Sequence, residues 1–170
     1  MQEPENWSGE HCNISGYTHE VISPINVANN LLVRGMKTGV EINTLKLQRL
    51  VYLLYKDYLK ETGNSLFTDP FETWKSGAVI PCIYNVFSPY GMKPIKSLAP
   101  NCVGESYIVA EKGVFRSCID RTWDKYSWCS AERLSELIRT KGSAWDKARE
   151  RKDRYLNLHD IKEEADYIPY

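Results

Sequence analysis

Two histidines and a cysteine near the start of the chain are residue types that suit metal chemistry. His11, Cys12 and His19 carry the imidazole and thiolate donors that zinc prefers. A structural zinc site needs four such ligands, and this spacing fits no zinc finger. We therefore predict no metal site and interpret the three residues as incidental members of a polar surface segment. His159 lies in a polar tail, where we expect it to be exposed.

Hydrolytic catalysis requires a nucleophile with a base beside it, and the sequence offers no such pair. No serine lies in a Gly-x-Ser-x-Gly turn, and no glycine-rich phosphate loop is present. Glu72, Asp120 and Asp124 are carboxylates without a paired arrangement. The sequence predicts no catalytic residue, no cofactor and no enzyme. A small enzyme stays a third hypothesis, because sites assemble across a fold; a buried polar cleft with a perturbed carboxylate or histidine would reveal it.

A group of aromatic and basic residues in the middle of the chain suits protein binding. Trp74 is followed by Lys75, Gly77 allows a turn, and Tyr84 lies in the next predicted helix. We interpret a lysine beside an exposed aromatic side chain as a feature of a protein interface. We predict that this interface also includes the basic residues Arg139 and Lys141.

The alternative for the aromatic residues is that they belong to the core, where such side chains dominate packing. Phe71 and Trp145 could line a groove together with Trp74 and Tyr84. We favour the core for Phe71 and Trp145, and leave Trp74 open.

A run of basic residues towards the C-terminal side is the best candidate for a charged patch. Its basic members are Arg139, Lys141, Lys147, Arg149, Arg151, Lys152 and Arg154, and Asp146, Glu150 and Asp153 dilute it. A solvated helix face with ion pairs four residues apart is the favoured interpretation. Nucleic-acid binding is disfavoured, because nucleic-acid binders show a stronger excess of positive charge on one face. If the ligand were a nucleotide or nucleic acid, an anion-binding pocket of Lys75, Arg139 and Lys141 would distinguish that hypothesis.

Composition and charge are those of an ordinary soluble globular protein. The chain has 170 residues, enough for one domain with a real core. Its 22 basic and 22 acidic side chains cancel, which removes any long-range attraction to nucleic acid or anionic membrane. No apolar run approaches the roughly 20 residues of a membrane helix, and the first residues lack the features of a secretion signal. Five cysteines without CxxC spacing are expected to be reduced, with Cys118 in the core, which predicts a cytoplasmic protein.

Helical spacing of apolar residues predicts a mainly α fold, a compact single domain with a minor short-strand component. Ser23 caps a first helix that Gly35 ends. Asn43 or Thr44 caps a central helix that stops at Gly63. The core stripe of this helix comprises Leu47, Leu50, Val51, Leu54 and Tyr58. The charged residues largely off that stripe are Lys46, Arg49, Lys56, Asp57 and Lys60.

Shorter elements complete the predicted domain. Short strands are expected at 71–75 and 107–109, and Pro81 suits the first turn of a helix. Further helices are expected at 114–126, after Ser130, after Ser143 and near 158–165. The predicted organisation is an N-terminal extension (1–22), a helical domain (23–154) and a C-terminal tail (155–170).

A series of different short motifs, each present once, follows a fixed order through most of the chain. They are Val27-Ala28-Asn29, Leu45 to Tyr52, Thr62-Gly63, Phe71 to Lys75, Gly77 to Pro81 with Tyr84, Leu134 to Leu137, and Ala144-Trp145 with Ala148. Together they resemble the Panacea domain, a family of small phage-associated and toxin–antitoxin proteins that includes the SocA-type proteolytic adaptor antitoxins. The resemblance spans about residues 25–150. Four sites depart from the family pattern, which makes the chain a divergent member: Ser76 for an aromatic residue, Ala78 and Ala144 for prolines, and Ile138-Arg139 for a Thr/Ser-His pair.

The resemblance implies a protein-binding module. Members of the family neutralise a partner protein, usually a toxin, by direct contact, and one type delivers its toxin to a protease. We therefore expect a protein toxin or another host or phage protein as partner, with no membrane involved. The alternative is a phage accessory or anti-defence protein that binds a host factor, a nucleotide or nucleic acid.

Overall fold

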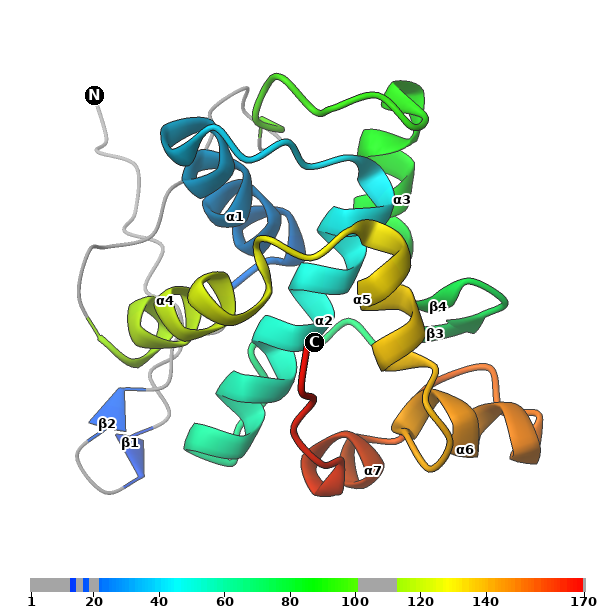
Figure 1. Cartoon of the computed structure of the whole chain (residues 1–170). Coiled ribbons are helices and arrows are strands. Elements are labelled where there is room, and N and C mark those ends of the chain that lie inside the picture. Colours follow the sequence, from blue (N-terminus) through cyan, green and yellow to red (C-terminus); the bar gives the residue numbers. More distant parts are fainter. Residues whose placement is uncertain (1–12, 15–16, 19–21, 101–112, 170) are drawn as a thin grey trace, which may run out of the picture.

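The computed structural model describes residues 13–14, 17–18, 22–100 and 113–169, and it confirms the predicted mainly α fold. Figure 1 shows helices surrounding one central helix, α2 (Thr44–Thr62), with a short β-hairpin at one side. In these residues the pairing of strands is limited to two separate two-stranded antiparallel sheets. One consists of β1 (Asn13–Ile14) and β2 (Tyr17–Thr18), in the predicted N-terminal extension.

The first helix, α1 (Pro24–Thr38), begins as predicted but ends later. The Ser23 hydroxyl caps it by accepting a hydrogen bond from the backbone N–H of Asn26. The prediction that Gly35 ends this helix is wrong, because the left-handed stop is Gly39. Gly35 is instead buried within the helix, where a Cβ would lie 2.8 Å from the carbonyl oxygen of Val40. A glycine there lets the following connection fold back against the helix.

Helix α2 forms the centre of the core. Asn43 caps its start and Gly63, in the left-handed region, ends it, both as predicted. The predicted core stripe is confirmed, with Leu47, Leu50, Val51 and Leu54 fully buried. Three charged residues off the stripe, Lys46, Arg49 and Lys56, are buried too, whereas Asp57 and Lys60 are half-buried. The elements that pack against α2 are α1, α3 (Pro81–Phe87), α4 (Val114–Tyr126), α5 (Ala131–Ile138), α7 (Leu158–Glu163) and β4 (Gly77–Val79).

Two of the later helices begin at the capping residues that the sequence indicates. Ser130 caps α5 and Ser143 caps α6 (Ala144–Arg151), each through its hydroxyl group. Cys118 of α4 is fully buried, as predicted for a small apolar core residue. A 3₁₀ turn (Ser88–Tyr90) follows α3.

The second sheet pairs β3 (Glu72–Trp74) with β4, so the predicted strand near residue 71 is half of a hairpin. The outer edge of β3 is covered by residues 154–156. There the N–H of Thr73 donates to the carbonyl of Arg154 at 2.8 Å, and the N–H of Leu156 donates to the carbonyl of Phe71 at 2.9 Å. The C-terminal segment thus lies along the hairpin before α7 begins.

Some predictions fall on residues that the structure does not describe. The strand expected at 107–109 and the group of His11, Cys12 and His19 lie outside the described residues. Within them, no helix has the length and apolar character needed to cross a membrane.

Candidate partner-binding site

Two features require a glycine at position 77, which follows the hairpin turn: the backbone conformation there and the buried side chain of Arg49. Lys75 and Ser76 form the turn, and Gly77 follows with a φ of 139°, in the region that favours glycine. A Cβ on Gly77 would lie 2.7 Å from Cζ of Arg49, which is far inside van der Waals contact. The hairpin therefore rests directly on the guanidinium group of α2.

Arg49 holds the hairpin through two hydrogen bonds and contacts α5 through a third, although it forms no ion pair among the described residues. Nη1 donates to the carbonyl of Ala78 and Nη2 to the carbonyl of Ser76, both at 2.7 Å, while Nε donates to Oγ of Ser135 at 2.9 Å. Burial, with a smaller contribution from Arg139, lowers the pKa of Arg49 to about 10. The guanidinium group is still charged at neutral pH, so these are charge-assisted hydrogen bonds, which are stronger than neutral ones.

Gln48, the neighbour of Arg49, fixes the next part of the chain. Its side-chain N–H donates to the carbonyl of Ile80, and its side-chain oxygen accepts from the N–H of Ile80, each at 3.0 Å. Ile80 lies between β4 and the start of α3, so consecutive polar residues of α2 set the position of both elements.

Aromatic side chains line the hairpin. The rings of Trp74 and Tyr84 meet edge to face with centroids 4.9 Å apart, and Tyr84 is 44% exposed. The indole N–H of Trp74 donates to Glu72, and that of Trp145 donates to the backbone carbonyl of Trp74 at 2.7 Å. Phe71 is buried as predicted, whereas Trp145 is only half-buried at the rim of the core, where it braces the hairpin.

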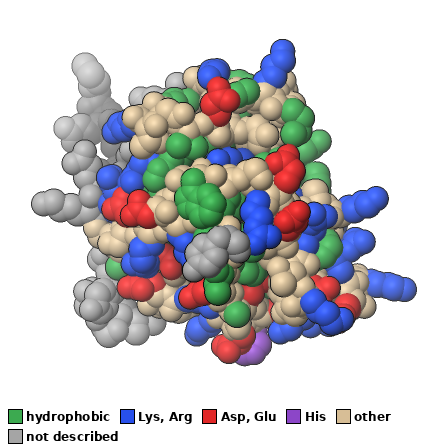
Figure 2. Space-filling model, in the orientation of Figure 1, with side chains coloured by type: hydrophobic (Ala, Val, Ile, Leu, Met, Phe, Trp, Pro, Cys, Tyr) green, Lys and Arg blue, Asp and Glu red, His purple; other side chains and the backbone are tan. Residues whose placement is uncertain are grey.

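The predicted site residues fall on one side of the molecule. Lys75 is exposed at the hairpin tip, Arg139 is exposed at the end of α5, and Lys141 is exposed in the turn before α6. Figure 2 shows Lys and Arg side chains projecting at the right-hand edge, where Figure 1 places the hairpin and α6. We call this predicted site the hairpin face: Trp74, Lys75, Tyr84, Arg139 and Lys141 at or near the surface, with Gly77 buried below them. Their role in binding stays a prediction.

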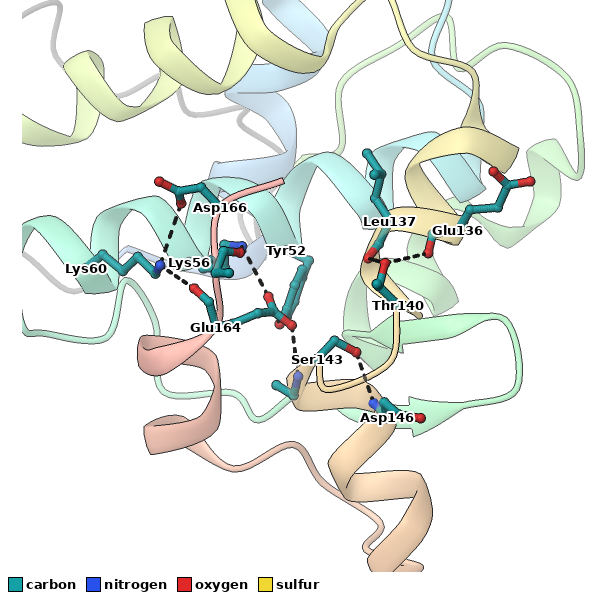
Figure 3. Close-up of polar contacts among 12 residues, drawn as sticks. Tyr52, Lys56, Lys60, Glu136, Leu137, Thr140, Ser143, Asp146, Glu164 and Asp166 are labelled. Atoms are coloured by element: carbon teal, nitrogen blue, oxygen red, sulfur yellow. Dashed lines mark hydrogen bonds and ion pairs between the residues drawn. The ribbon is translucent and has the colours of Figure 1, made fainter. Parts of the chain in front are cut away.

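A buried ion pair about two turns further along α2 from Arg49 holds the C-terminal segment, and the sequence did not indicate it. Nζ of Lys56 lies 3.2 Å from Oε2 of Glu164, with the side chains 4% and 3% exposed. Glu164 also accepts hydrogen bonds from the hydroxyl of Tyr52 and from the N–H of Ala144, as Figure 3 shows. Lys60 donates to the carbonyl of Glu164. The cluster joins α2, the start of α6 and the chain after α7.

The thiols that the structure describes are poor candidates for nucleophiles. Burial, with a smaller effect of Asp69, raises the pKa of Cys82 to about 11. Burial is also the main cause that raises the pKa of Cys118 to about 12 and that raises the pKa of Cys129. A raised pKa keeps each thiol protonated at neutral pH and therefore unreactive. In the described part of the chain, no three His, Cys, Asp or Glu side chains are grouped so that they could hold a metal ion.

The fold and the site define a small helical protein that presents an aromatic and basic face on a hairpin held by buried polar side chains. The chain belongs to the family described as "Antitoxin SocA-like, Panacea domain", whose model matches residues 47–146. That range includes the whole hairpin face.

A curated relative is similar over much of the chain. "Antitoxin SocA" of Caulobacter vibrioides (strain NA1000 / CB15N) is 29% identical over 126 residues, which cover 71% of this chain. The match spans 66% of the relative, just under two thirds of its length. No solved structure matches the chain.

Proposed function

We propose that this protein is an antitoxin that binds a protein toxin by direct contact and neutralises it, using the hairpin face. Its family is described as antitoxin SocA-like, and its relative from Caulobacter vibrioides carries the name antitoxin. The observation that carries the choice of surface is the contact between half-buried Trp74, on the hairpin tied to Arg49, and exposed Tyr84 of the following helix α3. Trp, Tyr and Arg are the residues that most often dominate binding energy at protein interfaces.

Preorganisation supports the same surface. Arg49 and Gln48 fix the backbone of the hairpin and of α3, and both Trp indole N–H groups are already bonded within the protein. A partner that meets this surface has little conformational entropy to remove from it, which favours affinity.

Growth rescue by co-expression tests the proposal. The chain is co-expressed with the products of its neighbouring genes, each first tested alone for toxicity. We expect one of them to be toxic alone, and we expect the chain to restore growth and to co-purify with that toxin. Alanine at Trp74 or Lys75 should weaken binding, by about 2 kcal/mol or more for Trp74 if it is an anchor residue. Trp128→Ala is the matched control, because Trp128 is 60% exposed and lines a different surface depression of about 470 Å³. Unchanged binding in both hairpin variants, with folding intact, would remove the hairpin face from the proposal.

Delivery of the toxin to a protease is the finer form of this function. If the chain acts as an adaptor, its co-expression should shorten the half-life of the toxin in a pulse-chase experiment. Simple neutralisation should leave that half-life unchanged or longer.

Nucleotide or nucleic-acid binding is the second candidate. The exposed cations Lys75, Arg139 and Lys141 favour an anionic ligand, although they do not distinguish a phosphate from a carboxylate. If the purified chain carried bound nucleotide or nucleic acid and no protein partner, this candidate would be favoured over the antitoxin function.

A further inference from the structure

We propose that the hairpin face recognises an acidic segment of its protein partner, with an aromatic or aliphatic side chain of that segment against Trp74 and Tyr84. This inference rests on the proposed function and adds the chemistry of the partner to it. It follows from three properties of the surface: unpaired cations, carboxylates that are already engaged, and an apolar centre.

The cations around the hairpin face are largely free of ion pairs. Within the described residues, no carboxylate lies within ion-pair distance of Lys75 at the hairpin tip or of Arg139 and Lys141 after α5. Arg149 and Lys152 at the end of α6 have none either, and the guanidinium group of Arg149 instead lies 5.6 Å from the ring centre of Trp145. A solvated helix face with internal ion pairs, as the sequence favoured, therefore describes only part of the basic run.

The other basic residues of that run do form internal pairs. Arg151 contacts Asp153 and Asp160, Lys147 lies 4.0 Å from Asp160, and Arg154 pairs with Glu72 at 3.0 Å. The carboxylates of Asp153, Asp160 and Glu72 are therefore already engaged in ion pairs within the protein.

Two carboxylates of α6 form no ion pair in the described structure. Asp146 accepts the backbone N–H of Gly142, while Glu150 is exposed. The five unpaired cations outnumber these two carboxylates, so the surface has an excess of positive charge although the whole chain has none. Positive potential of this kind steers an acidic partner and selects against a basic one.

The aromatic centre favours a protein segment over nucleic acid. The rings of Trp74 and Tyr84 meet edge to face, so they do not present two parallel faces on which successive bases could stack. Asp146 and Glu150 would repel a continuous phosphate backbone, while an acidic peptide can place its carboxylates selectively. Half-buried Trp74 and exposed Tyr84 together suit an apolar side chain, which a polypeptide supplies and a phosphodiester chain does not.

Titration with model ligands tests the inference directly. The probes are a capped peptide of Asp and Glu with a single central Phe, the same peptide with Lys in place of the acids, and a single-stranded oligodeoxynucleotide of similar length. Binding is followed by the indole N–H signals in NMR spectra of the full chain, where Trp128 serves as an internal control. We expect the acidic peptide to move the signals of Trp74 and Trp145 and to leave that of Trp128, with an affinity that falls as salt is added.

Charge reversal identifies the residues. Replacing Lys75, Arg139 and Lys141 together by Glu should weaken binding of the acidic peptide by about tenfold or more. The matched control makes the same change of net charge at exposed lysines outside the hairpin face: Lys37, Lys93 and Lys162. We expect that control to bind almost as the unchanged chain does.

Several outcomes would overturn the inference: no binding of the acidic peptide, equal binding of the Lys peptide, tighter binding of the oligonucleotide at the same signals, or equal loss in both triple variants. The growth rescue is independent of these. Rescue that persists after charge reversal would reject the acidic partner while the antitoxin function stands. Specific binding of the acidic peptide without any rescue would reject the function and leave the surface chemistry intact.

Discussion

Replacement of Gly77 by alanine should be among the most damaging single-methyl changes in this protein. Gly77 has a φ of 139°, where an L side chain is strained by about 1–3 kcal/mol. The new Cβ would also lie 2.7 Å from Cζ of Arg49, whereas carbon atoms in contact are about 3.5–4.0 Å apart. The guanidinium group must therefore move by roughly 1 Å, and it has no open side to move into because Arg49 is fully buried.

That movement determines the magnitude of the effect. It breaks or stretches the hydrogen bonds from Arg49 to the carbonyls of Ser76 and Ala78. A buried acceptor that loses its partner costs about 1–3 kcal/mol. With the backbone strain added, and allowing for partial relaxation, we expect Gly77→Ala to lower the free energy of unfolding by about 3–6 kcal/mol. Domains of this kind have a total stability of about 5–15 kcal/mol, so the change takes a large part of it.

Urea denaturation followed by far-ultraviolet circular dichroism measures the effect. Gly39→Ala is the matched control, because Gly39 also has a positive φ, 73°, but a Cβ there would meet nothing within 4 Å. Gly39→Ala should lower the free energy of unfolding only by the strain of a left-handed backbone at an L residue, about 1–2 kcal/mol. In an Arg49→Leu background the penalty for Gly77→Ala should fall towards that of Gly39→Ala. Equal penalties for the two glycines in the unchanged background would refute the reasoning.

The remaining predictions concern two carboxylates. Glu164→Gln should lower the free energy of unfolding by about 3–5 kcal/mol, because it leaves the buried ammonium of Lys56 without its charge partner. The control is Asp166→Asn, since Asp166 is exposed in its ion pair with Lys60. In the same denaturation experiment this control should lower the free energy of unfolding by less than about 1 kcal/mol. The hydrogen bond from Trp74 is the main cause that lowers the pKa of Glu72, and Arg154 adds to it. The stabilisation by this carboxylate is therefore present above the ordinary glutamate pKa and is lost as the pH falls through the lowered value in the folded state. In acid denaturation, Glu72→Gln should not show this pH-dependent loss of stability. If the variant and the unchanged chain had the same dependence of stability on pH, the lowered pKa would not belong to Glu72.

Much of the fold could be predicted because its signals are local. The apolar stripe of α2 and the caps at Ser23, Asn43, Ser130 and Ser143 each depend on residues within a turn or two of one another. The prediction that Gly35 ends α1 failed because the glycine is required there by a contact beyond its own helix. The backbone at Val40 returns so close to Gly35 that a side chain would not fit.

The part of the site that lies beneath the surface could not be predicted. Arg49 and Lys56 look like solvent-facing positions of a helix, because periodicity records only the apolar stripe. Their acceptors are distant in the sequence: the hairpin carbonyls for Arg49, and Glu164, more than a hundred residues away, for Lys56. The near-continuous apolar surface of α2 was the one available hint, since a helix covered on all sides must bury its polar residues as well.

The hairpin has no vacant strand edge. Residues 154–156 bond to β3, while the carbonyls at 76 and 78 are taken by Arg49 and both backbone groups of Ile80 by Gln48. A partner cannot join this sheet as an additional strand, so it has to bind the hairpin through side-chain contacts. Under the proposed function, the specificity of the hairpin face can change during evolution by exchange of Trp74, Lys75 or Tyr84, while the scaffold below it stays the same. Divergent members of one family could in this way acquire different targets without redesigning their fold.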